Sequence, residues 1–584
     1  MNTWDLSGLY EGFDQRYEKD LTALDRAMDD YKSFIANEEG RDDVTLIEGY
    51  LSRREDIIQR VMTLGSYARL TWATNVNDQV APVYLAKIQR IMQKATAEDV
   101  RFSRHLAMLD LSELAEKSAS IATYSYILKR EQKQAKHLLS EKEEVLYARM
   151  RELASGSWSD LQGLLTANLS VRYRDRTMTL SEVRNLAYDH DSAVRKDAYE
   201  AEIKAYEGID DAVALALSNI KREVKTLDDF RGYKSTLDKT LFQSRLDRDA
   251  LDAMLRTMED YRHHFARYLQ AKARYLGHEG SLPFYDLFAP VGKIEKTYSY
   301  EEAQDIIKRA FAGFSDKLKA FAQKAFDRKW IDLEPRKGKR GGAFCSNQPQ
   351  IKESRILTNF TGSLSDVLTL SHELGHGYHG DVISNNGPLH WSYPMPLAET
   401  ASIFCETIVN EHLLETIDDP KATMAILENA LQGDTQVIID ILSRFYFETD
   451  VFRHADGPIP KNRLKDMMVQ AQKKAYGDGL DHDYLHPYMW LNKPHYYSAG
   501  LNFYNFPYAF GLLFAKGLYA EYRKDKKRFI SAYDDLLAMT TKADVKDVAK
   551  TMGIDVTKKD FWSSSLELIR RDIDRTIDLL KRNG

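Results

Sequence analysis

The sequence predicts a large, mainly α-helical protein. Its 584 residues are 43% hydrophobic and 29% charged, an ordinary composition for a globular chain. Pro82 is the only proline among the first 282 residues. Apolar residues three and four positions apart alternate with charged ones in stretches such as LTALDRAMDDYKSFI and LDAMLRTMEDYRHHFARYL, a spacing typical of amphipathic helices. These observations together predict a helical body with few interruptions.

Turn-forming residues mark the places where the helical pattern should break. Glycine, proline, asparagine and serine gather near residues 73–82, 154–160, 276–283 and 334–350, and these residue types favour turns. None of the four segments is a long flexible linker, and the chain shows no internal repeat or low-complexity tract. The pattern therefore excludes a solenoid and favours one large helical body.

A short β-structure is expected in GGAFCSNQPQIKESRILTNFTGS at 341–363, where SRILTNF is typical of a strand before a turn at Gly362. Ser365 is then expected to cap a helix that ends near Gly380. Apolar residues at positions 367, 368, 370 and 374 predict that this helix is buried.

The expected buried helix carries the segment SHELGHGYHGD at 371–381. Residues four apart share one face of a helix, so His372 and His376 can direct ring nitrogens at one metal ion about 2 Å away. Glu373 is displaced around the helix and stays free to act on a bound water. The spacing predicts a zinc site; the alternative is a helix with two ordinary core or surface histidines.

A catalytic zinc site needs a third protein ligand and one open position. A third histidine six residues beyond His376 is excluded, because Val382 stands there. The segment 397–417 reads as a long helix after Pro396, and Glu399 in its first turn is the predicted ligand. Glu406 lies seven residues on, on about the same face, and is predicted to orient a histidine; its alternative is a solvated helix acid.

His379 follows His376 by three residues and shares the ligand face. Three ligands already leave the single vacancy that catalysis needs. We therefore expect His379 to support the site or to contact the substrate, with direct metal binding as the alternative.

Hydrogen-bond donors concentrate in NKPHYYSAGLNFYNFPYAFG at 492–511, which contains His495, Tyr504 and Tyr508. Attack of a metal-activated water on a carbonyl group forms an oxyanion, and one donor aimed at such an oxygen is worth about 3 kcal/mol. The segment is therefore a candidate source of donors. The alternative is a buried tyrosine-rich helix in a chain with 33 tyrosines.

Composition also limits partners and location. The 82 basic and 88 acidic side chains leave a net charge of −6, so we expect neither nucleic acid nor a membrane as a partner. Cys345 and Cys405 are the only cysteines and predict two buried thiols rather than a disulfide framework. The first residues, MNTWDLSGLYEGFDQRYEKD, are acidic where a signal peptide is basic, and no run of eighteen apolar residues follows, which predicts a cytoplasmic protein.

Several of these segments resemble a known family, the zinc oligopeptidases of the thimet oligopeptidase type, and within it the bacterial oligoendopeptidase F branch. The resemblance extends over most of the chain. It rests on TWDLSGLY at 3–10, FYDLFAPVG at 284–292, GGAFC at 341–345, LSDVLTLSHELGHGYHG at 364–380 and PLAETASIFCE at 396–406.

The resemblance implies one zinc ion on His372, His376 and Glu399, with Glu373 as general base. In NFYNFPYAFG it places Tyr504 and Tyr508 at the positions of the family's catalytic tyrosines, with His495 as the preceding histidine. The spacing between His495 and the tyrosines is longer than is usual in this branch, so the tyrosine that meets the oxyanion stays open.

The resemblance also implies a two-lobed helical body around a deep central substrate channel, with a small β-sheet beside the zinc helix. Residues 1–195 would form part of the channel wall, and 196–584 would be the catalytic domain. Such a channel admits short unstructured oligopeptides. Gly342, Ala343 and Phe344 would lie at a sheet edge to which the peptide adds as a strand, giving broad specificity.

The predicted function is that of a zinc-dependent endopeptidase of oligopeptides. An aminopeptidase of similar chemistry is disfavoured, because Cys345 and Ser346 stand where an acidic residue would bind the substrate amine. A carboxydipeptidase stays open, since no residue that binds a C-terminal carboxylate can be located. A non-catalytic helical scaffold is disfavoured by Glu373, which a structural metal site does not need. The oligomeric state is not predicted.

Overall fold

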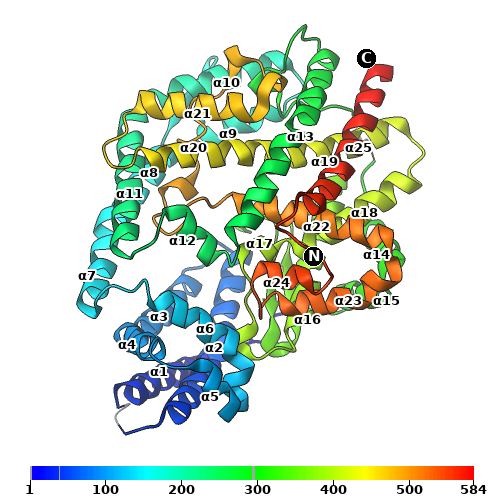
Figure 1. Ribbon diagram of the computed structural model, residues 1–584. Coiled ribbons are helices and arrows are strands. Elements are labelled where there is room, and N and C mark those ends of the chain that lie inside the picture. Colours follow the sequence, from blue (N-terminus) through cyan, green and yellow to red (C-terminus); the bar gives the residue numbers. More distant parts are fainter. Residues whose placement is uncertain (1–2, 38–39, 293–295, 584) are drawn as a thin grey trace. The chain divides into compact units, whose positions relative to one another are not determined.

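A computed structural model describes residues 3–37, 40–292 and 296–583. The fold is mainly α-helical, as predicted, with two small sheets (Figure 1). The chain forms two compact units, and each is assembled from three separate stretches. The first comprises Met1–Val145, Lys296–His412 and Asp525–Gly553, and the second comprises Leu146–Glu295, Leu413–Lys524 and Ile554–Gly584. Neither unit begins or ends at residue 195, and the domain boundary expected there stays a prediction.

The helices of the first unit fall in all three of its stretches. They are α1 (Gln15–Ala36), α2 (Asp43–Thr74), α3 (Ala81–Met92), α4 (Thr96–Leu106), α5 (Leu111–Lys117), α6 (Ala119–Ala135), α14 (Tyr300–Phe314), α15 (Asp316–Asp327), α16 (Leu364–Ile383), α17 (Met395–Ala398), α23 (Lys526–Met539) and α24 (Val545–Lys550). Two further helices, α7 (Glu141–Arg151) and α18 (Thr400–Thr416), run across a boundary between units in the sequence.

The helices of the second unit are α8 (Ser157–Ala167), α9 (Leu180–Asn185), α10 (Ser192–Tyr206), α11 (Asp210–Phe230), α12 (Thr236–Gln243), α13 (Arg248–Tyr275), α19 (Pro420–Thr435), α20 (Ile441–Arg453), α21 (Lys461–Tyr476), α22 (Phe506–Lys524) and α25 (Lys559–Asn583). Their apolar faces form the core. In α11, for example, Val213, Leu217, Ile220 and Val224 recur at helical spacing and are all buried.

Three of the four breaks expected from turn residues are confirmed, and one is wrong. Residues 334–343 form a loop between the strands Ile331–Asp332 and Phe344–Gln348. α2 ends at Thr74 and α3 starts at Ala81 with Pro82 in its first turn, and α13 ends at Tyr275. At 154–160, however, no break occurs: a π-helical turn at Glu152–Gly156 joins α7 to α8. Glycine and serine without a proline leave every backbone N–H available, so the helix widens there instead of ending.

A β-hairpin interrupts the helical region that the sequence pattern predicted as continuous. β1 (Ser170–Tyr173) pairs antiparallel with β2 (Arg176–Thr179), and Arg174 in the turn has a φ of 51°. In β1, Val171 and Tyr173 are buried while their neighbours are exposed. This alternation in SVRYRDRTMT was the signal that could have found the hairpin.

A three-stranded sheet lies where β-structure was predicted. Its order is β3 (Ile331–Asp332), β5 (Glu353–Leu357) and β4 (Phe344–Gln348), so β4 is an edge strand. β5 runs parallel to β3 and antiparallel to β4, with Phe344 opposite Leu357.

The histidine helix α16 begins and ends differently from the prediction. Its cap is Ser363, not Ser365, because Ser363 and Asp366 form a reciprocal capping box. It ends at Ile383, three residues past the predicted Gly380. The four apolar residues predicted to be buried, at 367, 368, 370 and 374, are buried.

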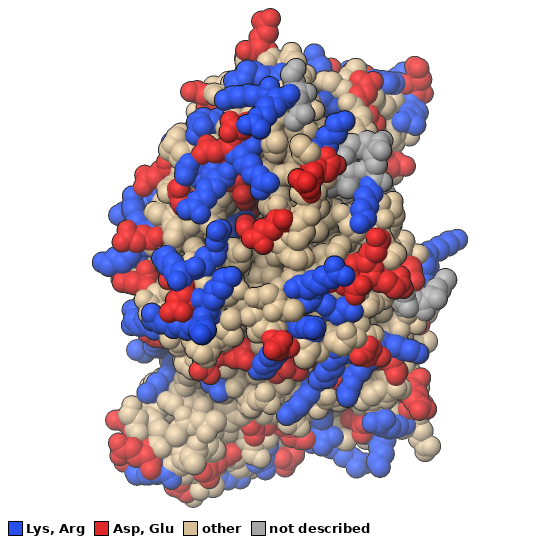
Figure 2. All heavy atoms as spheres, turned by 90° about the vertical axis from the view of Figure 1, so that its right-hand side faces the viewer, with Lys and Arg blue, Asp and Glu red and all other residues tan. Residues whose placement is uncertain are grey.

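The charged side chains on the surface agree with the balanced net charge of the chain. Figure 2 shows Lys and Arg side chains interspersed with Asp and Glu over the face drawn there. Among the helices in the described residues, none combines the length and the hydrophobicity required to cross a bilayer.

Candidate metal centre

The metal centre depends on a close approach of α16 to α18. At Gly375, an added Cβ would lie 2.5 Å from the carbonyl oxygen of Ala401 and 2.6 Å from Cα of Ser402. At Gly380, it would lie 2.1 Å from Cγ of Asn347 on β4. Only glycine at 375 lets the backbone of α18 come this near to α16, and glycine at 380 leaves room for the side chain of Asn347, whose Nδ2 donates to the His376 carbonyl over 3.1 Å. The two glycines therefore bring the elements of the site together.

The sequence predicted that Glu399 lies in the first turn of one long helix. This prediction is wrong. Glu399 stands between α17, which ends at Ala398, and α18, which begins at Thr400. Pro394 caps α17 and Pro396 lies in its first turn, so α17 starts as a separate short helix before α18. Ser402 Oγ donates to Glu399 Oε2 over 2.8 Å and helps to hold the carboxylate.

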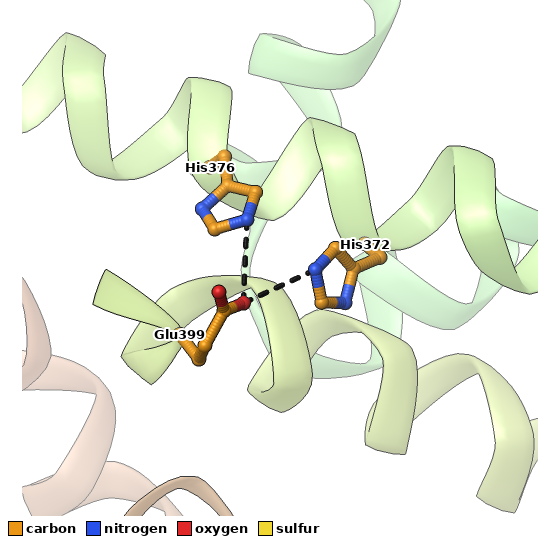
Figure 3. Close-up of side chains that lie close together, drawn as sticks. All are labelled: His372, His376 and Glu399. Atoms are coloured by element: carbon orange, nitrogen blue, oxygen red, sulfur yellow. Dashed lines mark ion pairs between the residues drawn. The ribbon is translucent and has the colours of Figure 1, made fainter. Parts of the chain in front are cut away.

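Glu399 and the two histidines of α16 converge (Figure 3). Glu399 Oε2 lies 3.2 Å from His372 Nε2 and 3.3 Å from His376 Nε2. The three candidate ligand atoms lie within 4.8 Å of one another. A tetrahedral zinc site with bonds near 2.0–2.1 Å has ligand atoms about 3.3–3.4 Å apart. The chemistry and the spacing of these residues fit such an ion.

Glu406 lies behind His372. Its Oε2 is 3.0 Å from His372 Nδ1, so an Nδ1–H can donate to the carboxylate while Nε2 keeps its lone pair for a metal. Burial lowers the pKa of His372, but the Glu399 and Glu406 carboxylates outweigh it and raise that pKa to about 10. Burial alone would raise the pKa of Glu399, whereas His372 and His376 hold it well below its usual range. The two carboxylates thus favour positive charge at this site, which a metal ion held at Nε2 of His372 would supply.

Glu373 is the buried acid next to this cluster. It is 6% exposed, and its Oε2 finds no hydrogen-bond partner among the described residues. Burial raises its pKa, against the opposing effects of His372 and His376 and a hydrogen bond from the backbone N–H of Cys345. A buried carboxylate oxygen without a protein partner beside three converging ligands suits a position that holds a water.

The edge strand β4 passes this acid. Ile356 N–H donates to Trp330 and Thr358 N–H to Asp332, so these residues face β3 and the alternate residues of β5 face β4. By the register, the backbone groups of Cys345 then point away from β5, and its N–H donates to Glu373. Gly342, at a φ of 80°, has its carbonyl bound by Asn359 Nδ2 at 2.8 Å.

His379 lies outside the ligand cluster. It is fully buried, its Nε2 is 2.8 Å from Thr540 Oγ1, and its ring stacks on Tyr393 with centroids 4.2 Å apart. Burial lowers its pKa to about 3, so the ring is neutral. The described residues that could jointly hold a metal ion are His372, His376 and Glu399, without His379.

The C-terminal donors come together within the second unit. Tyr508 Oη donates to Tyr504 Oη over 2.9 Å, and the rings of His495 and Tyr504 lie 5.7 Å apart. Tyr504 precedes α22 and Tyr508 lies in its first turn, so the two tyrosines do not share one helix. Asn505, which the sequence analysis missed, places Nδ2 3.0 Å from His495 Nε2.

Comparison with known families identifies the chain. Residues 185–568, more than half of it, match the sequence model described as Peptidase family M3, and residues 109–170 match the one described as Oligopeptidase F. The chain belongs to peptidase family M3. The resemblance predicted from the sequence is confirmed, and membership of this family makes the protein a metallopeptidase.

Similar M3 proteins match along nearly the whole chain. Oligopeptidase PepF of Bacillus subtilis is 24% identical, over 100% of this chain and 88% of the relative. Group B oligopeptidase PepB of Streptococcus agalactiae is 25% identical, over 99% and 96%. The crystal structure of oligoendopeptidase-F from Enterococcus faecium shares the fold with a TM-score of 0.72 at 18% identity, over 97% of this chain and 99% of that one.

Proposed function

We propose that this M3 metallopeptidase is a zinc-dependent endopeptidase that hydrolyses short, unstructured oligopeptides. The observation that supports it is the convergence of His372, His376 and Glu399 beside Glu373, whose Oε2 has no hydrogen-bond partner among the described residues. Zinc held by these three ligands supplies a Lewis acid that polarises a peptide carbonyl and acidifies a water molecule. Without Glu373, the same three ligands would make a metal site with no base beside it.

Glu373 acts as the general base in this proposal. Its free Oε2 takes a proton from the attacking water and returns it to the leaving amine. The Cys345 N–H holds the carboxylate in place from β4. Glu406 keeps His372 oriented through Nδ1, which stabilises the ligand geometry that Glu373 depends on.

The substrate lies along the outer edge of β4. The backbone carbonyl of Cys345 points away from β5 and is not used by Glu373, so an extended peptide can pair with it as an added strand that continues past Ala343. Gly342 and Phe344 flank these positions. Main-chain pairing selects little among side chains, which supports broad specificity.

The oxyanion donors are His495, Tyr504 and Tyr508, which lie together in the second unit. His379 supports the site by stacking on Tyr393 and does not bind the metal. A deep central substrate channel, with residues 1–195 in part of its wall, belongs to the same proposal, as does a cytoplasmic location. Oligopeptides are the proposed partners, and neither nucleic acid nor a membrane surface is.

The test is the variant Glu373→Gln, assayed for zinc content and for cleavage of a fluorogenic oligopeptide. We expect full zinc content and a loss of kcat of several orders of magnitude, because the base is lost while the ligands remain. Retained activity in Glu373→Gln would contradict the mechanism, and it would leave a structural metal as the better explanation.

Blocked substrates separate the alternatives. The wild-type enzyme should cleave peptides that carry an N-acetyl group and a C-terminal amide, with internal products found by mass spectrometry. Loss of cleavage on acetylation would indicate an aminopeptidase, and loss on amidation would indicate a carboxydipeptidase.

A further inference from the structure

His495 ends a chain of polar groups inside the second unit. Asp440 Oδ2 lies 2.5 Å from Arg444 Nη2. Arg444 Nη1 donates to Asn505 Oδ1 over 3.2 Å, and Asn505 Nδ2 lies 3.0 Å from His495 Nε2. Asp440 and Asn505 are buried, at 3% and 6% exposure. The four side chains therefore form one connected network, in which Asp440 and Asn505 are buried and Arg444 and His495 are partly exposed.

The guanidinium group of Arg444 fixes the direction of the hydrogen bonds from Arg444 to Asn505 and from Asn505 to His495. A guanidinium has donors only, so the atom of Asn505 that faces Arg444 must be the carboxamide oxygen. The NH₂ group of Asn505 then faces His495 and can only donate. His495 Nε2 must therefore accept, and in a neutral imidazole the proton is then on Nδ1.

Two structural features hold the network in place. A π-helical turn at Gln436–Asp440 leads into α20, and Asp440 and Arg444 lie four residues apart on one helix face. Next to Asn505, the buried Lys221 Nζ binds Asn502 Oδ1 at 2.9 Å and Glu448 Oε1 at 2.8 Å. The segment between Asn502 and Asn505 is thus anchored, although Phe503 has a strained φ of 49°.

We propose that Asn505 is a positioning residue that keeps His495 a neutral imidazole with its proton on Nδ1. Among the described residues, none lies within hydrogen-bond distance of His495 Nδ1, so this N–H is free to meet a ligand. The role of that donor, an N–H offered to the substrate carbonyl as it becomes an oxyanion, rests on the proposed peptidase function. The position of the proton does not.

The surroundings favour the neutral ring. Burial, together with the positive charges of Arg444, Lys493 and Lys221, lowers the pKa of His495 to about 3. An imidazolium would also present an Nε2–H to the NH₂ group of Asn505, two donors facing each other. His495 is therefore a donor whose charge does not change near neutral pH.

The direct test is ¹⁵N NMR of the full-length chain with labelled histidine, using His495→Gln to assign the resonances. In the wild type we expect a protonated Nδ1 and an unprotonated Nε2 on His495. Asn505→Asp keeps the size and the contact to Arg444 but places a carboxylate oxygen at His495, so Nε2 should become protonated. Asn168→Asp, an exposed change at the end of α8, is the matched control and should leave His495 unchanged.

Kinetics provide the second measurement. Asn505→Asp should lower kcat on an oligopeptide by about 100-fold, as for loss of an oxyanion donor, with KM within about twofold and zinc content unchanged. Asn505→Ala, which adds no charge, should give a mixture of His495 tautomers and a smaller loss of kcat.

Three results would overturn parts of the inference. Wild-type His495 with the proton on Nε2, or an Asn505→Asp spectrum identical to the wild type, would refute the role of Asn505. A switched tautomer with unchanged kcat would refute the donor role of His495. If the wild type cleaved no peptide at all, the proposed function would fail, and the spectra would still decide the position of the proton.

Discussion

Gly375 sets the distance between α16 and α18, so the variant Gly375→Ala tests the reasoning behind the metal centre. In an unobstructed helix, this change is expected to stabilise the fold by about 1 kcal/mol, since alanine has the higher helix propensity. Here the new Cβ would lie 2.5 Å from the Ala401 carbonyl oxygen, where ordinary contacts start at 3.4 Å. The obstacle is backbone and cannot rotate away, so the two helices must separate by about 0.9 Å.

That separation would move Glu399, because it stands only two residues before Ala401. Metal–ligand distances tolerate about 0.2 Å of error, several times less than the expected shift. We therefore expect Gly375→Ala to bind zinc at least about 100-fold more weakly, a loss of about 2.7 kcal/mol. Overpacking should also destabilise the apo-protein by about 1–3 kcal/mol.

The assay is competition for zinc against a chelating dye, with thermal unfolding of the metal-free protein in parallel. The matched control is Gly313→Ala in α14, where an added Cβ meets nothing within 4 Å. This control should keep zinc affinity and gain slightly in stability. Wild-type zinc affinity in Gly375→Ala, with a stability gain like that of the control, would refute the argument from close packing.

Two further predictions concern groups around the site and in the core. Glu406→Ala should weaken zinc binding by about 10–100-fold because His372 Nδ1 loses its partner. The control Glu415→Ala, at an exposed position of α18, should keep the wild-type zinc affinity. If the dye competition gave Glu406→Ala and the wild type the same zinc affinity, the orienting role of Glu406 would be excluded. Lys221→Met should destabilise the fold by about 3–5 kcal/mol in urea unfolding, because Glu448, 3% exposed in its side chain, is left as an unpaired buried charge. The double variant Lys221→Met, Glu448→Gln should recover much of this loss, and a single-variant cost below about 1 kcal/mol would contradict it.

Local periodicity explains what could be read from the residues alone. The helical class, the buried positions of α16 and the shared face of His372 and His376 follow from 3.6 residues per turn, which any helix obeys. The same spacing leaves Glu373 off the ligand face. The strand β5 was also predictable, because the short run SRILTNF, with Ile356, Thr358 and Phe360, stands between turn-forming residues.

Errors arose where a local pattern had two outcomes. The segment ASGSWSD suggests a break, yet the helix continues as a π-helical turn. The segment SVRYRDRTMT was predicted as part of a helical region, although its apolar and polar residues alternate as in a hairpin with one buried face. Propensity is a weak prior in such cases, because packing against distant residues decides between the alternatives.

The sequence by itself determined the ligand types, the HExxH spacing and the helix that carries it, since these depend on neighbours within one or two turns. Only the tertiary structure decided that Glu399 stands between two helices, that His372 is the histidine which Glu406 orients, and that Asn505 faces His495. These contacts join residues 10 to 34 positions apart. Their geometry depends on how closely the backbones pack, as between α16 and α18 at Gly375. The distance between two packed backbones cannot be predicted from local periodicity.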